Sequence, residues 1–107
     1  MIPITRVRME RCAGYHSVAK FSVEFGGGDI VISRLSLMKH DMDGKTEPGN
    51  LFVGYPRDYS VPVTDGIAYV TPGDSMREKI LSAAYGAYMH LEETGTRFVD
   101  WQPPAST

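Results

Sequence analysis

Three runs near the start of the chain alternate between apolar and polar residues, and this period of two is the feature that most limits the possible folds. The runs cover residues 4–11, 18–25 and 30–37. Such alternation indicates strands with one buried side and one solvent-facing side. The glycine-rich segment 26–29 predicts a tight turn that joins the second and third strands as a hairpin.

The alternation slips by one residue near Arg34. Before it the inward set is Ile30 and Ile32, and after it Leu35 and Leu37. A β-bulge places an extra residue in one strand and restores the inward face beyond it. The pattern therefore predicts a bulge at Arg34.

One long helix is predicted before Gly95, which is well placed to end it. Ser75 and Glu78 have the spacing of a capping box and predict where the helix begins. Its apolar face is expected to comprise Met76, Ile80, Ala84, Ala87 (or Ala83), Tyr88 and Leu91.

Between these parts lie a polar loop (39–50), a short strand (51–55) stopped by Pro56, and an expected last strand (66–71). The prediction is an α+β fold in which one long C-terminal helix packs on an antiparallel sheet of four to five strands. Residues 1–95 are expected to form the domain and residues 96–107 a C-terminal tail that lies across it through Trp101.

The chain has 107 residues, which suits one domain, and its small size favours a homodimer. Cys12 is the only cysteine, so a reducing compartment is the simpler expectation. No apolar run reaches the roughly 20 residues that cross a bilayer, and the N-terminus lacks the apolar core of a signal peptide. We expect a cytoplasmic protein that does not bind membranes.

The net charge of −2 hides an asymmetry between the two parts of the chain. Residues 1–40 carry six Lys or Arg against three acids, whereas residues 41–107 carry five against ten. A nucleic-acid-binding protein usually has a basic surface. The average charge therefore opposes that function unless the cations gather locally.

Candidate catalytic groups are sparse. Cys12 and His16 lie four residues apart in a loop, while His40 and His90 belong to no motif. A small apolar role suits Cys12 better than a reactive thiol. We expect no enzymatic activity.

Two glycine-containing segments resemble ligand loops only superficially. Residues 40–44 (His-Asp-Met-Asp-Gly) lack the further acids and the final Glu of a calcium loop. The triple glycine 26–28 lacks the Lys-Ser/Thr of a phosphate-binding loop. A solvated loop and a hairpin turn are the better interpretations, so neither a metal nor a cofactor is expected.

Cations are the remaining candidates for function. Arg77 and Lys79 fall in the first turn of the helix, where positive charge opposes the helix dipole. Two interpretations stay open: a neutral accident, or an anion site that uses these cations and free backbone N–H groups. Arg6 and Arg8 share one face of the first strand, which is either a solvated face or an extension of that site.

Several segments together resemble the SpoVG family of small bacterial septation and sporulation regulators. The likeness covers residues 4 to about 91 and rests on segments that the sequence shows as Ile4–Met9, Ala19–Val23, Leu51–Pro56, Asp65-Gly66, Pro72, Ser75–Ile80, Ala84 and Tyr88. The strand Leu-Phe-Val-x-x-Pro followed by the Arg-x-Lys-Ile helix start is the most specific part.

The resemblance implies a dimeric protein that binds DNA or RNA and regulates expression. It places Arg77 and Lys79 at basic positions of the family's helix start, and Arg6 and Arg8 at basic positions of its first strand. The family has a Lys/Arg-rich stretch after the proline, whereas only Arg57 supplies charge here. Weaker nucleic-acid binding is therefore expected.

The leading hypothesis is a homodimeric regulator that contacts phosphates through Arg77, Lys79, Arg57, Arg6 and Arg8. The rival is a protein-interaction module on the same scaffold, which would use the Tyr-rich segment (Tyr55, Tyr59, Tyr69) or the Trp101 tail. The acidic balance of residues 41–107 favours the rival.

Overall fold

The computed structural model describes residues 3–14, 16–58, 67–68 and 72–104. Its elements in chain order are β1 (Ile4–Arg11), β2 (Ser17–Phe25), the 3-10 turn η1 (Gly26–Gly28), β3 (Ile30–Lys39), the 3-10 turn η2 (Pro48–Asn50), β4 (Leu51–Gly54), β5 (Arg57–Asp58), β6 (Ile67–Ala68), α1 (Asp74–Thr94) and β7 (Phe98–Trp101).

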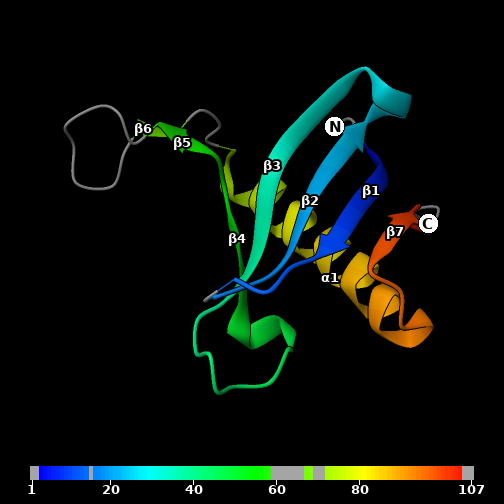
Figure 1. The fold of residues 1–107 in the computed structure, drawn as a ribbon. Helices are drawn as coiled ribbons and strands as arrows, with labels where there is room; N and C mark the ends of the chain where they lie inside the picture. Colours follow the sequence, from blue (N-terminus) through cyan, green and yellow to red (C-terminus); the bar gives the residue numbers. More distant parts are fainter. Residues whose placement is uncertain (1–2, 15, 59–66, 69–71, 105–107) are drawn as a thin grey trace.

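Five strands form one antiparallel sheet in the order β4-β3-β2-β1-β7, and α1 lies across one of its faces (Figure 1). The predicted α+β fold is confirmed. β5 and β6 pair separately as a two-stranded sheet away from the main one. The expected strand 66–71 is described only at β6, and its remainder lies outside the described residues.

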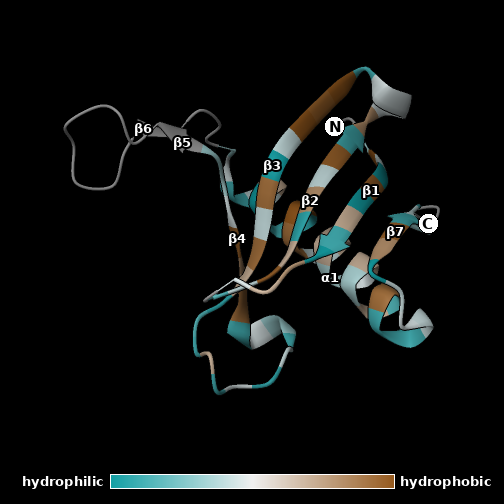
Figure 2. Ribbon diagram, viewed as in Figure 1, coloured by the Kyte–Doolittle hydropathy of each residue, from teal (hydrophilic) through white to brown (hydrophobic). Residues whose placement is uncertain are grey.

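The core lies between the sheet and α1, where the inward residues of the strands meet the small-residue face of the helix. Figure 2 shows the apolar positions alternating with polar ones along β1, β2 and β3. The buried apolar residues are Val7, Met9, Ala19, Phe21, Val23, Phe25, Leu35, Leu37, Leu51, Ile80, Ala83, Ala84, Ala87, Tyr88, Leu91 and Val99. Burial of each large side chain contributes about 1.5–3 kcal/mol, so this layer dominates the stability.

The predicted bulge is present at Arg34. Phe21 pairs with Leu35 and Val23 pairs with Ile32, so one residue of β2 opposes two residues of β3. Arg34 takes a left-handed backbone conformation with φ 61°, and no other non-glycine residue described has a positive φ. This conformation costs about 1–2 kcal/mol for an L-residue other than glycine.

The turn that joins β2 to β3 requires its glycines. Gly26, Gly27 and Gly28 have φ values of 59°, 72° and 106°, which side chains with a Cβ rarely adopt. The Thr5 hydroxyl accepts a hydrogen bond from the Gly27 N–H at 3.1 Å and donates one to the Glu24 carbonyl at 3.3 Å. β1 therefore holds the base of the turn.

The helix begins earlier than predicted. Gly73 is the N-cap, Asp74 lies in the first turn, and no side chain caps the helix. The capping box of Ser75 and Glu78 is thus wrong, because the Gly73 carbonyl already accepts the Arg77 N–H at 2.9 Å. The other end agrees with the prediction, since Gly95 ends α1 with φ 67°. In the described part of the chain no helix is long and apolar enough to cross a membrane.

Residues 98–101 form an edge strand of the sheet rather than part of a tail laid across the body. β7 pairs with β1, with Val99 opposite Met9 and Trp101 opposite Val7. The Trp101 ring packs on α1 at Gly86, where an added Cβ would lie 2.5 Å from the ring. Glycine at this position lets the helix approach the ring.

The loop 40–50 is held closed by hydrogen bonds of its own. Asn50 Oδ1 accepts the Asp41 N–H at 2.9 Å, and Asn50 Nδ2 donates to the carbonyls of Asp41 (2.9 Å) and Lys45 (3.0 Å). Asp41 Oδ1 accepts the Asp43 N–H at 3.0 Å. The polar residues of this loop therefore satisfy its backbone.

We predict that Gly86→Ala destabilises the fold. Alanine favours a helix over glycine by about 1 kcal/mol, but overpacking against the Trp101 ring costs typically about 1–3 kcal/mol. Urea unfolding should show a lower free energy of unfolding for Gly86→Ala than for the wild type. Gly49→Ala is the matched control, because nothing lies within 4 Å of a Cβ there. An increase in stability for Gly86→Ala would contradict the packing.

Arg11 links the end of β1 to the last turns of α1. Its Nη1 donates to Glu92 Oε1 at 2.6 Å. The hydrogen bond from Arg11, and a second from Tyr88, hold the pKa of Glu92 below its usual value. Burial raises the pKa of the Tyr88 phenol, and Glu92 raises it further.

The lowered pKa of Glu92 predicts an acid-dependent contribution to stability. A carboxylate with a depressed folded-state pKa stabilises the fold above its unfolded value of about 4.5, and the gain is lost as the pH falls through the folded value. Because both side chains are partly exposed, the contribution should stay below about 1 kcal/mol. Urea titrations across that pH range should show a smaller acid loss for Glu92→Gln than for the wild type. Glu93→Gln should leave the loss unchanged, and identical behaviour of the two variants would argue against the link.

Candidate nucleic-acid interface

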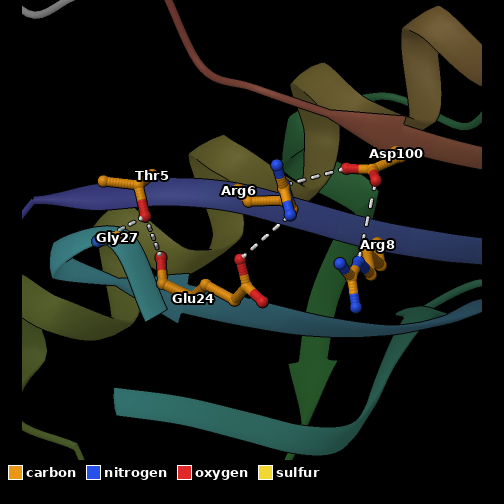
Figure 3. A network of polar contacts seen from close by, with 6 residues as sticks. All are labelled: Thr5, Arg6, Arg8, Glu24, Gly27 and Asp100. Carbon is orange, nitrogen blue, oxygen red and sulfur yellow. Dashed lines mark hydrogen bonds and ion pairs between the residues drawn. The ribbon is translucent and has the colours of Figure 1, made fainter. Parts of the chain in front are cut away.

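Arg6 and Arg8 lie on the face of the sheet that α1 leaves uncovered, here called the helix-free face, together with Glu24 and Asp100 (Figure 3). Arg6 Nε is 3.2 Å from Asp100 Oδ1, and Arg6 Nη1 is 3.7 Å from Glu24 Oε2. Arg8 Nε is 3.7 Å from Asp100 Oδ2. The buried Arg6 Nε makes no well-directed hydrogen bond, so these contacts are ion pairs.

These pairs place Arg6 and Arg8 in a nearly neutral setting. β7 brings Asp100 beside β1, and Arg97 Nη2 pairs in turn with Glu10 Oε1 at 3.2 Å. A phosphate at either arginine would compete with a carboxylate already in place. The first strand therefore does not present two unpaired cations.

Arg77 does not lie beside Arg6 and Arg8. It lines a recess at the end of the ladder between β3 and β4. The pair Ser36–Gly54 is at one end of the ladder. Beyond it, β4 leads to Tyr55 and Pro56, and the bulge of β3 at Arg34 lies two residues before Ser36. The recess has a volume of about 490 Å³ and is here called the β3–β4 notch. Its lining consists of Arg34, Ser36, Met38, Phe52, Val53, Gly54, Tyr55, Pro56 and Arg77.

The β3–β4 notch combines two arginines with two aromatic rings, and the described residues that line it include no acid. Within the described part of the chain, neither Arg34 nor Arg77 has a carboxylate within 4.0 Å. The Arg77 guanidinium lies 6.0 Å from the centre of the Tyr55 ring, at the outer limit of a cation–π contact. The notch is therefore the described site whose cations remain available.

Tyr55 adds an unused polar group. Its hydroxyl oxygen is buried and has no hydrogen-bond partner among the described residues. Burial raises the pKa of this phenol, and the nearby Arg77 opposes the rise. The hydroxyl is thus protonated at neutral pH and has a hydrogen bond to offer.

The ring of Phe52, near the start of β4, stacks on the ring of His40, which directly follows β3. The ring centres are 4.4 Å apart and the planes are inclined by 29°. Phe52 pairs across the ladder with Met38, and both line the notch. Aromatic and thioether groups thus extend away from the two arginines.

Lys79 faces a second recess, in which β1 and the segment after β7 diverge. β7 pairs with β1 only over residues 7–10, which leaves a space of about 1220 Å³ beside the start of β1. Lys79 lines this space together with Arg6 and Glu24. Arg77 and Lys79, although neighbours in the sequence, therefore serve two separate surfaces.

Arg57, Tyr59 and Tyr69 are the remaining predicted contacts. The backbone of Arg57 forms β5 directly after Pro56, but its side chain lies outside the described residues. Tyr59 and Tyr69 also lie outside them.

The sequence reasoning missed Arg34 as a site residue, although it located the bulge there. The signal was present, because a large cation occupies a bulge position where the backbone favours glycine. Its nearness to Arg77 depends on how β3, β4 and α1 pack, which no local pattern reveals.

Cys12 is a free, half-buried thiol, and His16 Nδ1 lies 3.2 Å from the Lys39 carbonyl. Among the described residues, no three His, Cys, Asp or Glu side chains are grouped in a way that could hold a metal ion.

In the part of the chain that the structure describes, the architecture is an α+β class with one long helix on one face of an open antiparallel sheet and an arginine–aromatic notch at one edge. Comparison with known proteins adds no family to this class. No family model, no curated protein and no solved structure matches the chain.

The ion pairs of the helix-free face should contribute little to stability. The side chains of Arg6, Arg8 and Asp100 are 33%, 48% and 45% exposed, and pairs of this kind contribute about 0.2–1 kcal/mol. Asp100→Asn should therefore lower the free energy of unfolding by at most about 1 kcal/mol, and by less at high ionic strength. Urea unfolding at two salt concentrations measures both. A loss of several kcal/mol that persists in high salt would contradict this prediction and show that the fold depends on these ion pairs.

Proposed function

We propose that this protein is a small nucleic-acid-binding regulator that works as a homodimer in the cytoplasm and contacts phosphates mainly through arginines. The observation that carries the proposal is the β3–β4 notch, in which Arg34 and Arg77 have no carboxylate of the described residues within 4.0 Å. A guanidinium binds phosphate through two parallel hydrogen bonds and keeps its charge at all physiological pH values. The likeness to the SpoVG family supports the regulatory role and the pairing of subunits.

The proposal ranks the predicted phosphate-binding residues differently from the sequence analysis. Arg77 is central and gains Arg34 as its neighbour. Lys79 is a contributor from a separate surface, and Arg57 a contributor next to the notch in sequence. Arg6 and Arg8 take a minor part, because Glu24 and Asp100 already bind them.

A protein partner is the second candidate, and the helix-free face supports it. That face carries alternating charges in ion pairs and two exposed apolar side chains, Val31 (49%) and Phe98 (54%). A mixed surface of this kind suits a protein better than a polyanion. If so, purified protein should show no affinity for nucleic acid even at low ionic strength.

We predict that nucleic-acid affinity falls steeply with salt and that the notch arginines set the slope. Each phosphate contact contributes about 0.7 to the slope of log K against log [salt] for single strands, and about 0.9 for duplexes. Arg34→Gln combined with Arg77→Gln should therefore reduce the slope by about 1.4–1.8 and weaken binding at low salt. Fluorescence anisotropy with labelled oligonucleotides measures both quantities.

Lys45→Gln combined with Arg97→Gln is the matched control, since it removes the same formal charge from exposed positions that do not line the notch. Equal losses of affinity in the two double variants would show that binding depends on the total charge of the protein and not on the notch. Absence of any nucleic-acid binding at low ionic strength would contradict the proposed function. Sedimentation analysis of the same samples tests the homodimer.

A further inference from the structure

We infer that the β3–β4 notch binds single-stranded nucleic acid, stacks a base on the Phe52–His40 ring pair and holds the adjoining phosphates on Arg34 and Arg77. This inference rests on the proposed function and specifies its substrate. It concerns the strandedness of the ligand and the atoms that recognise it.

The shape of the site is the first reason. The notch is a recess of about 490 Å³ at a sheet edge, within the size range of pockets that hold small organic groups. A base that is paired and stacked within a duplex cannot enter such a recess. A base from a single strand can be splayed out and inserted.

The arrangement of chemical groups is the second reason. The cations Arg34 and Arg77 come from β3 and α1 and reach the notch from two sides, whereas Met38 and Phe52 supply apolar surface between them and the loop 40–50. His40 extends that surface, because its ring lies 4.4 Å from the Phe52 ring. Proteins that bind single strands combine a cationic track with aromatic platforms in this way.

The unused hydroxyl of Tyr55 is the third reason. It is buried in the described structure without a hydrogen-bond partner. A buried polar group without a partner is destabilising, and because the oxygen is inaccessible in the free protein, a ligand oxygen or ring nitrogen would satisfy it after rotation of the Tyr55 side chain toward the notch. The position beside Arg77 makes a phosphate or base acceptor the suitable partner.

The backbone of Arg34 agrees with this assignment. A non-glycine residue is retained at φ 61°, where glycine would relieve the strain. Strained positions of this kind are concentrated at functional sites. The exposed guanidinium on the bulge is a reason to retain an arginine here.

The experiment compares four labelled probes of equal length by fluorescence anisotropy at low salt. They are an oligothymidylate, an oligouridylate, a DNA duplex, and a DNA strand that carries abasic spacers in place of nucleosides. We expect the two single strands to bind at least about tenfold more tightly than the duplex. The abasic strand should lose about 5- to 100-fold, because each stacked base contributes on that scale.

The variants test the named side chains. Phe52→Leu keeps an apolar residue in the fold but removes the stacking ring, and His40→Ala removes the exposed partner. Each should weaken binding of the thymidylate strand about fivefold or more and leave binding of the abasic strand unchanged. Phe98→Leu, an exposed ring at the opposite edge of the sheet, is the matched control. Arg34→Gln leaves the backbone strain in place and should weaken binding of both single-stranded DNA probes.

The outcomes separate the two levels of the proposal. Duplex binding that equals or exceeds single-strand binding would overturn this inference and leave the nucleic-acid function standing. Single-strand binding that is unaffected by Phe52→Leu and Arg34→Gln would overturn the location. Failure of all four probes at low ionic strength would overturn the proposed function itself and favour a protein partner. Tighter binding of the uridylate than of the thymidylate strand would identify RNA as the ligand.

Discussion

The packing of one helix on one face of the sheet is the interaction on which the rest of the structure depends. Small residues on α1, among them Ala83, Ala84 and Ala87, let the helix lie close to the inward side chains of the strands. Because α1 is the one α-helix among the described residues, those residues bury only one face of the sheet. The opposite face must be satisfied by polar side chains, and both sheet edges remain open to solvent.

Unequal strand lengths then create the recesses. β1 and β3 have 8 and 10 residues, whereas their outer partners β7 and β4 have 4 each. The long inner strands extend beyond their partners, and a notch forms where each outer strand leaves the sheet. α1 contributes side chains to the lining of both recesses, Arg77 to one and Lys79 to the other. The fold thus produces two candidate sites from one difference in length.

Local signals predicted the local features well. The period of two identified the three long strands, helical spacing identified the buried face of α1, and the slip of the pattern located the bulge at Arg34. Gly95 was identified as the helix end because only glycine readily adopts φ 67°. The error at Ser75 has a local cause as well, since the Gly73 backbone initiates the helix without a side-chain cap.

Contacts between distant segments could not be predicted in the same way. Asp100 neutralises Arg6 and Arg8 only because β7 pairs with β1, and a four-residue strand after a helix gives a weak sequence signal. Arg34 and Arg77 approach one notch because β3, β4 and α1 pack together. Charge counted along the sequence therefore misrepresented the surface. Three of the six cations in residues 1–40, namely Arg6, Arg8 and Arg11, are paired with carboxylates, whereas Arg34 at the bulge has no described carboxylate within 4.0 Å.

This distribution bears on what the molecule can bind. Where a guanidinium faces a carboxylate at 3–4 Å, a phosphate must displace that partner and repel its charge, so the net gain from binding is small. Where guanidiniums stand without acids beside rings, a phosphate gains the full attraction and a base gains a surface to stack on. In the described part of the chain, the β3–β4 notch meets the second condition, and the cluster of Arg6, Arg8, Glu24 and Asp100 meets the first. A modest net negative charge is therefore compatible with a polyanionic ligand, provided that contact is confined to one edge of the sheet.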